Sequence, residues 1–212
     1  MKRNFFYLLG ATALFFASCV ENPEGKKAET TEASNAAGAS ATGTLFTIDP
    51  AASSVEWLGK KVTGQHHGTV QIKSGEVFVD NGQLTGGSFV LDLNTIDNKD
   101  LEGEYKGKLE GHLKSADFFD VENHPEASFQ ITSVKPGTAE GQVIVSGNLT
   151  LRGVTKNITF DATIEEATAS SFKAFADFNI AREDWGVNYS GKADDLISKE
   201  INLKINMTAV NG

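Results

Sequence analysis

The chain has 212 residues, with 19 Lys and Arg against 28 Asp and Glu, which gives a formal net charge of −9. This length fits one or two domains and excludes a large multidomain enzyme, and an acidic chain without a basic cluster excludes sequence-independent binding to nucleic acid. The single cysteine, Cys19, excludes an intramolecular disulfide, a zinc site made of several cysteines and a CxxC redox centre. We therefore expect neither a nucleic-acid partner nor a metal cofactor.

Residues 1–18 have the pattern of a targeting signal. A positively charged start precedes an apolar run over residues 5–16, which is shorter than the ~20 residues needed to span a bilayer. The run ends in Ala17-Ser18-Cys19, which resembles the bacterial lipoprotein signal, and this resemblance implies cleavage before Cys19 and acylation of that residue, for example by palmitate. The alternative is an ordinary secretory signal cleaved near Ala17, which would leave Cys19 as a free thiol.

Residues 19–44 differ in composition from the rest of the chain. They are rich in Ala, Thr, Glu and Gly and contain no aromatic residue. Such a segment buries too little apolar area to offset the entropy of ordering it. We therefore expect the lipidated Cys19 to be followed by a disordered linker that reaches about 25–30 Å as a flexible coil.

Residues 45–212 form the folded domain, and their apolar residues alternate with polar ones. This period of two is typical of half-buried antiparallel strands and predicts an all-β sandwich or barrel of roughly eight to ten strands. The clearest runs lie at residues 89–93, 143–151, 158–164, 172–180 and 201–209. Turn residues such as Asn81-Gly82 separate them.

Residues 100–116 break this alternation, because their apolar positions recur with helical spacing. These positions are Leu101, Tyr105, Leu109, Leu113 and Ala116. The pattern predicts one short helix, with Asn98 or Asp97 as its N-cap, that covers one end of the β structure. His112 falls at the centre of the same apolar stripe.

Three stretches of the domain resemble the signature motifs of the YceI-like family in both order and spacing. They are residues 112–129, HLKSADFFDVENHPEASF; residues 147–156, GNLTLRGVTK; and residues 180–187, IAREDWGV. The resemblance implies an antiparallel lipocalin-like β-barrel of about eight strands outside the cytoplasm. It also implies a long isoprenoid chain in the barrel core, such as an isoprenoid quinone or a prenyl carrier. One departure is that many members carry an Arg-Asp pair where this chain has Glu110-Gly111.

The residues themselves leave two interpretations of the barrel interior open. Inward side chains either pack against one another or leave a slot where small residues such as Gly147, Ala162, Ala174 and Ala176 face large rings. On the second interpretation the ligand-binding residues are Trp57, Phe89, Leu91, Phe129, Ile131, Leu149, Phe160, Phe172, Ala176, Phe178, Arg182 and His112.

Arg182 and His112 are the candidate polar contacts of a ligand. Arg182 continues the inward parity of residues 172–180, so it either binds a ligand headgroup at the barrel rim or pairs with Asp184. His112 either contacts the headgroup or is a neutral histidine hydrogen-bonded inside the helical cap. The neighbouring pair His66-His67 is expected on a surface loop rather than in a metal site.

Together these features predict a membrane-anchored lipoprotein of the bacterial envelope, in the periplasm or at the surface, that binds a polyisoprenoid or similar amphiphile. The alternative is a structural or interaction lipoprotein with a filled barrel and no ligand. An enzyme is not expected, because the chain lacks an evident nucleophile-base pair. The sequence leaves the oligomeric state open.

Overall fold

A computed structural model describes residues 20–34 and 41–211. Within these ranges the strands are β1 (Lys26–Lys27), β2 (Glu29–Glu32), β3 (Thr44–Ile48), β4 (Ser54–Lys61), β5 (Gly64–Asp80), β6 (Gln83–Asn98), β7 (Glu126–Pro136), β8 (Gln142–Leu151), β9 (Val154–Ala167), β10 (Ser171–Ala181), β11 (Gly191–Lys192) and β12 (Asp195–Val210). The helices are α1 (Gly103–Lys114) and the single 3₁₀ turn η1 (Arg182–Trp185). The predicted all-β class with one short α-helix is confirmed.

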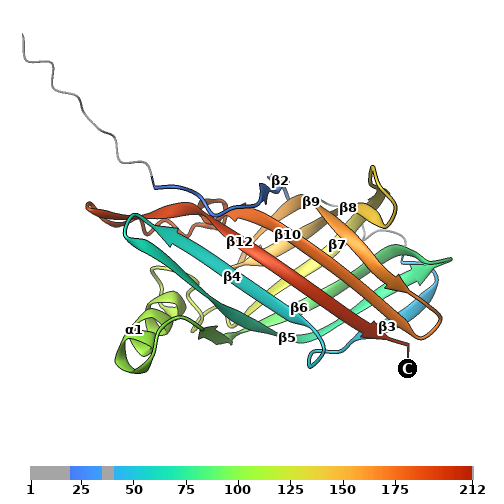
Figure 1. Cartoon of the computed structure of the whole chain (residues 1–212), viewed down its shortest axis with the longest axis horizontal. Coiled ribbons are helices and arrows are strands. Elements are labelled where there is room, and N and C mark those ends of the chain that lie inside the picture. Colours follow the sequence, from blue (N-terminus) through green and yellow to red (C-terminus); the bar gives the residue numbers. More distant parts are fainter. Residues whose placement is uncertain (1–19, 35–40, 212) are drawn as a thin grey trace, which may run out of the picture.

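The main strands form a closed antiparallel barrel (Figure 1). Around the barrel the order is β12, then β3 and β4 in turn, β5, β6, β7, β8, β9 and β10, and β10 pairs again with β12. Since β3 and β4 occupy one position between β12 and β5, the described chain makes an eight-stranded barrel. Short turns join β5 to β6 and β8 to β9, whereas the β6–β7 connection contains α1 and the β10–β12 connection contains η1. The predicted Asn81-Gly82 turn has the positive φ angles, 50° and 78°, that suit those two residues.

The two ends of the barrel differ in how they are filled. At the end of the barrel where the C-terminus lies (Figure 1), apolar side chains from several strands pack into a dense core. Phe46, Ile48, Val77, Phe172 and Ala209 are each at most 2% exposed there. α1 and η1 lie at the opposite end, where the barrel is hollow.

The helix occurs where it was predicted, but its start differs from the prediction. The N-cap is Glu102, without a capping side chain, because β6 extends through Asn98 and the chain turns before α1 begins. The Asn98 side chain is fully buried and instead accepts a hydrogen bond from the backbone N–H of Leu101, 2.8 Å away. Tyr105, expected on the covered face, is 73% exposed.

Residues 20–34, which we call the N-terminal strap, correct the prediction of a disordered linker. β1 pairs in parallel with β10 at residues 178–179, and β2 pairs antiparallel with β9 at residues 156–159. β9 and β10 pair with each other through residues 162–167 and 172–176. Outside these residues, β1 of the strap pairs with β10 and β2 pairs with β9; the strap is blue in Figure 1.

Backbone pairing explains why composition failed to predict the strap. The segment has few apolar side chains, but unpaired strand edges of β9 and β10 give its backbone groups hydrogen-bond partners. Asn148 adds a side-chain clamp, since it accepts from Ser34 N and donates to Ser34 O, both at 2.9 Å. Cys19 and the rest of the predicted signal lie outside the described residues.

Candidate functional site

A cavity of about 430 Å³ occupies the half of the barrel beneath α1 and η1. Its volume lies in the range of small-molecule sites, and most of its surface is aliphatic or aromatic. Nine predicted ligand-binding residues line it: Trp57, Phe89, Leu91, Phe129, Leu149, Phe160, Phe178, Arg182 and His112. The barrel interior is therefore hollow at this end.

The other three predicted residues, Ile131, Phe172 and Ala176, do not line the cavity. They belong to the dense core at the closed end, with exposed fractions of 7%, 0% and 7%. The substitution Ala176→Phe would therefore overpack the filled part of the core, and it would not obstruct the cavity.

The small inward residues do not create the slot that we predicted. Gly147, Ala162, Ala174 and Ala176 are all absent from the cavity wall. A Cβ atom on Gly147 would lie 2.2 Å from Cζ of Phe129, so the ring of Phe129 already fills that space. Small residues here allow close packing, and the cavity lies nearer the mouth.

Four phenylalanines form a continuous aromatic wall of the cavity. The ring centroids of Phe89 and Phe129 are 5.5 Å apart, and those of Phe129 and Phe160 are 5.7 Å apart. Phe160 stacks on Phe178 at 4.1 Å. Such a wall offers dispersion contacts to an extended hydrocarbon without a polar group that would need a partner.

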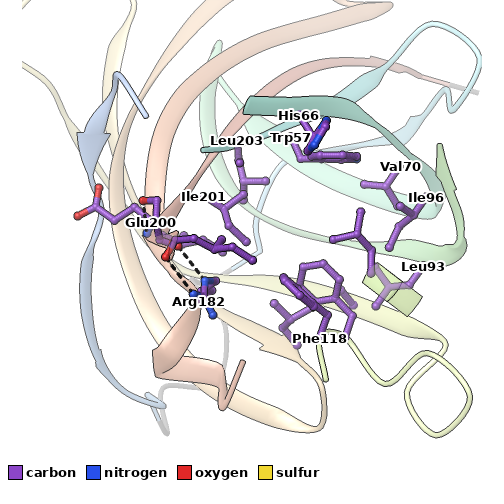
Figure 2. A pocket seen from close by; sticks show the side chains of 18 of the residues that line it. Trp57, His66, Val70, Leu93, Ile96, Phe118, Arg182, Glu200, Ile201 and Leu203 are labelled. Carbon is purple, nitrogen blue, oxygen red and sulfur yellow. Dashed lines mark hydrogen bonds between the residues drawn. The ribbon is translucent and has the colours of Figure 1, made fainter. Parts of the chain in front are cut away.

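Arg182 lies at the wall of the cavity and is 1% exposed (Figure 2). Its Nε donates to Ser198 O at 2.8 Å, Nη1 donates to Val187 O at 2.6 Å, and Nη2 lies 3.4 Å from Ile197 O. Among the described residues no ion pair joins it to Asp184, so the structure contradicts the alternative in which these two side chains pair.

The buried guanidinium has donors to spare. Burial lowers the pKa of Arg182, whereas nearby Glu183 raises it, and an arginine remains protonated at neutral pH. Of its five N–H groups, three have backbone acceptors. The other two can donate to a ligand oxygen, and its charge favours an anionic or strongly polar group.

An aromatic cluster surrounds His112 at the mouth. The imidazole makes edge contacts with Phe118 and Tyr189, at centroid distances of 5.0 and 4.7 Å. Its side chain is 36% exposed, and Nε2 lies 3.5 Å from a carboxylate oxygen of Asp117. His112 therefore faces both the cavity and the solvent, and it is not a histidine enclosed within the cap. Arg182 lies over the ring of Phe118, 6.0 Å from its centroid.

Charged residues that we did not predict complete the mouth. Lys61 and Asp195 form an ion pair at 2.7 Å, and the hydrogen bond from Lys61 lowers the pKa of Asp195. His66 Nδ1 lies 2.7 Å from Asp100, so it holds the end of β5 against the turn before α1. Extending the inward parity of Val55 and Trp57 along β4 would have found Lys61.

The three signature stretches meet at this mouth. Arg152, in the β8–β9 turn, donates to Ala116 O at 2.7 Å and also to Gly186 O. Trp185, fully buried, donates from Nε1 to Leu149 O at 3.1 Å. The three motifs therefore hold the loops around the opening, and residues that are far apart in the sequence contact one another there.

Residues 20–34 and 41–211 contain neither a cluster of metal-ligating side chains nor a candidate membrane-spanning helix. In this part of the chain no group of three or more His, Cys, Asp and Glu side chains is placed to hold a metal ion. Within the same ranges no helix is long and apolar enough to cross a membrane.

Comparison with known proteins gives a consistent result. A family model described as the YceI-like domain matches residues 46–209. A UPF0312 protein of Pseudomonas putida (strain W619) is 31% identical over 145 residues, which are 65% of this chain and 72% of that protein.

Two solved structures share the fold. Burkholderia cenocepacia BcnA aligns with a TM-score of 0.65 at 18% identity, covering 76% of this chain and 99% of BcnA. A polyisoprenoid binding domain from Saccharophagus degradans, implicated in plant cell wall breakdown, aligns with a TM-score of 0.59 at 17% identity. That alignment covers 80% of this chain and 99% of the domain.

Proposed function

Because this chain belongs to the YceI-like family, we propose that it binds a polyisoprenoid or a similar amphiphilic lipid inside its barrel and has no catalytic role. The solved relative from Saccharophagus degradans is a polyisoprenoid binding domain of the same fold, which supports this ligand class. The observation that carries the proposal is the apolar cavity of about 430 Å³, closed at one end and opening at the other.

The distribution of polar groups suggests how such a ligand lies. The hydrocarbon part would contact the aromatic wall of Phe89, Phe129, Phe160 and Phe178, where no polar group needs a partner. The headgroup would lie at the mouth, near the two N–H groups of Arg182 that have no acceptor among the described residues. An isoprenoid quinone offers a carbonyl there, and a prenyl carrier offers a phosphate.

The competing function is a structural or interaction lipoprotein with a filled barrel. The dense core around Phe172 and Ala176 fits that alternative in the closed half of the molecule. The hollow half does not, since protein interiors are normally packed without voids larger than a water molecule. We therefore favour ligand binding.

We further propose that the chain is anchored in the bacterial envelope through acylated Cys19. The support is the sequence pattern that ends in Ala17-Ser18-Cys19. Several acyl chains at ~0.8 kcal/mol per buried CH₂ would make the attachment effectively permanent. Cys19→Ser should move the protein from the membrane fraction to the soluble fraction. Persistence of that variant in membranes after a high-salt wash would exclude anchoring through Cys19.

The ligand proposal is tested by native mass spectrometry of protein purified from its own host, followed by organic extraction. We expect an extra mass on the folded protein that the extract identifies as an isoprenoid or another long-chain amphiphile. Protein that carries no extra mass, and that fails to take up isoprenoids added to it, would support the filled-barrel alternative.

A further inference from the structure

The N-terminal strap begins at the rim of the cavity. Val20 and Glu21 form a shallow hollow with the β4–β5 hairpin, which is the hairpin that contributes Lys60, Lys61 and His66 to the cavity wall. Glu21 also lies 3.9 Å from Lys60 Nζ. Since Val20 is bonded to Cys19, a group attached to residue 19 is linked to the chain one residue away from the rim.

The strap is held firmly along the residues that follow. Ser198 Oγ donates to Asn22 Oδ1 at 2.8 Å, and Asn179 Nδ2 donates to Pro23 O at 2.9 Å. Ser198 and Asn179 are each 1% exposed. The polar anchors of the strap are therefore parts of the barrel wall, and there is no long flexible spacer between residue 20 and the barrel.

The surface around the mouth carries exposed apolar groups. Val62, at the turn of the β4–β5 hairpin, is 42% exposed, and Tyr105, on the helix that covers the mouth, is 73% exposed. Tyrosine favours the membrane–water interface because its ring is apolar and its hydroxyl is polar. The lysines next to Tyr105 on α1, Lys106 and Lys108, are paired with acidic side chains, Lys108 with Glu104 at 2.7 Å.

We propose that the rim of the cavity faces the lipid bilayer, with the strap fixing the barrel mouth-down on the membrane surface. This inference rests on the proposed function in one respect, the lipid on Cys19. In this orientation an amphiphile passes between the bilayer and the cavity without its hydrocarbon part crossing water. Exposure of that hydrocarbon to water is the main free-energy cost that such a path avoids.

Lysine footprinting on membranes tests the orientation. The full chain is expressed, purified with its natural N-terminus and reconstituted into phosphatidylcholine vesicles, and lysine acetylation rates are then measured by mass spectrometry. Lys192 lines the mouth and Lys135 lies near the end of β7 at the closed end, and both are exposed. We expect acetylation of Lys192 to slow several-fold relative to detergent solution, while Lys135 is unchanged.

The mass of the N-terminal peptide reports acylation separately. If Cys19 proves unmodified, the proposed anchoring fails, and its thiol is then coupled to a maleimide lipid so that the orientation is still measured. Equal rates at the two lysines, or slower acetylation of Lys135, would overturn the mouth-down orientation.

A linker variant tests whether the strap is the cause. About twenty Gly and Ser residues inserted between residues 19 and 20 would give a flexible tether. With that insertion we expect the protection of Lys192 to be lost while the protein stays on the vesicles. Retained protection would show that the strap does not set the orientation.

Discussion

Arg182 combines a structural role with the polar chemistry of the cavity. Two of its backbone contacts, to Ser198 O and Ile197 O, join η1 to the start of β12, and the third, to Val187 O, holds the loop after η1. Its removal therefore takes a donor from the buried carbonyl oxygens of Ser198 and Val187. The free energy of unfolding of Arg182→Ala should therefore fall by about 2–4 kcal/mol. The inward parity of residues 172–180 predicted the direction of this side chain, but not the backbone carbonyl groups that it binds.

Ligand titrations separate the two roles of Arg182. Loss of a charge-assisted hydrogen bond should weaken binding of a headgroup-bearing isoprenoid by about ten- to a hundredfold, whereas a bare hydrocarbon chain should bind both proteins equally. Arg152→Ala is the matched control, because Arg152 also binds backbone carbonyls at the mouth but does not line the cavity. Equal losses for both ligands in Arg182→Ala would remove it from the headgroup site.

Single residues also show where sequence analysis succeeded and where it stopped. Alternation along each strand placed Phe89, Phe160 and Phe178 on the cavity side because side-chain direction is a local property of a strand. The same rule could not tell that Ala176 lies in the filled half, since the position of the void depends on how eight strands close. The sequence shows that position 147 is a glycine, but it does not show that the ring of Phe129, on another strand, fills the space beside it.

At the scale of elements, the strap depends on close contact at Gly25. This glycine has φ of 138°, and a Cβ atom there would lie 2.5 Å from Asn179 Oδ1 and 2.7 Å from Asn202 Nδ2. Gly25→Ala should therefore detach the strap while the barrel stays folded. The expected result is hydrogen exchange about ten- to a hundredfold faster at strap amides such as that of Ala28.

Gly64→Ala is the control for the strap, because a Cβ atom at Gly64 has no atom within 4 Å. It should leave exchange in the strap unchanged. If Gly25→Ala does the same, the packing of the strap against Asn179 and Asn202 is not what holds it in place.

The turn before α1 makes the mouth sensitive to acid. Burial alone would raise the pKa of Asp100, but hydrogen bonds from His67 N, His66 and Asn98 outweigh it and lower the pKa from its ordinary 3.8. A carboxyl group with a lowered pKa stabilises the fold above its unfolded-state pKa, and this contribution is lost as the pH falls through the folded-state value. The attachment of α1 should therefore weaken below about pH 4.

Asp100→Asn tests this dependence by thermal melting. At pH 7 the variant should be about 1–2 kcal/mol less stable than the natural chain. The difference should shrink as the pH falls below 3.8 and the natural carboxyl group protonates. Glu140→Gln, at an exposed loop position, should show no such difference at either pH. A difference for Asp100→Asn that is independent of pH would contradict an electrostatic cause.

The elements themselves were predictable to different degrees. The α-helix was found because its period differs from that of its flanking strands, but its cap was not, because β6 continues through Asn98. The strap was missed because its order comes from the edges of β9 and β10, which composition does not report.

At the scale of the whole molecule, one half of the barrel is a packed core and the other half encloses a cavity. The dense end around Phe172 supplies stability, while the hollow end is shaped by loops that Arg152 and Trp185 hold together. This division permits a void without a weak fold, because the cost of unfilled space is confined to one end.

Occupancy of the cavity is the central claim, and Leu203→Trp tests it most directly. Leu203 points into the cavity from β12 (Figure 2), so an indole there fills the space without entering the dense core. Val210→Trp, on the same strand but 44% exposed at the closed end, is the matched control. The three proteins, stripped of lipid, should have similar melting temperatures.

The measurement is native mass spectrometry during titration with an isoprenoid quinone. The account predicts one bound quinone on the natural chain and on Val210→Trp, and loss of that bound mass in Leu203→Trp. Equal binding by Leu203→Trp would place the ligand outside this cavity, and a natural chain that binds no quinone or other isoprenoid would contradict the proposed function itself.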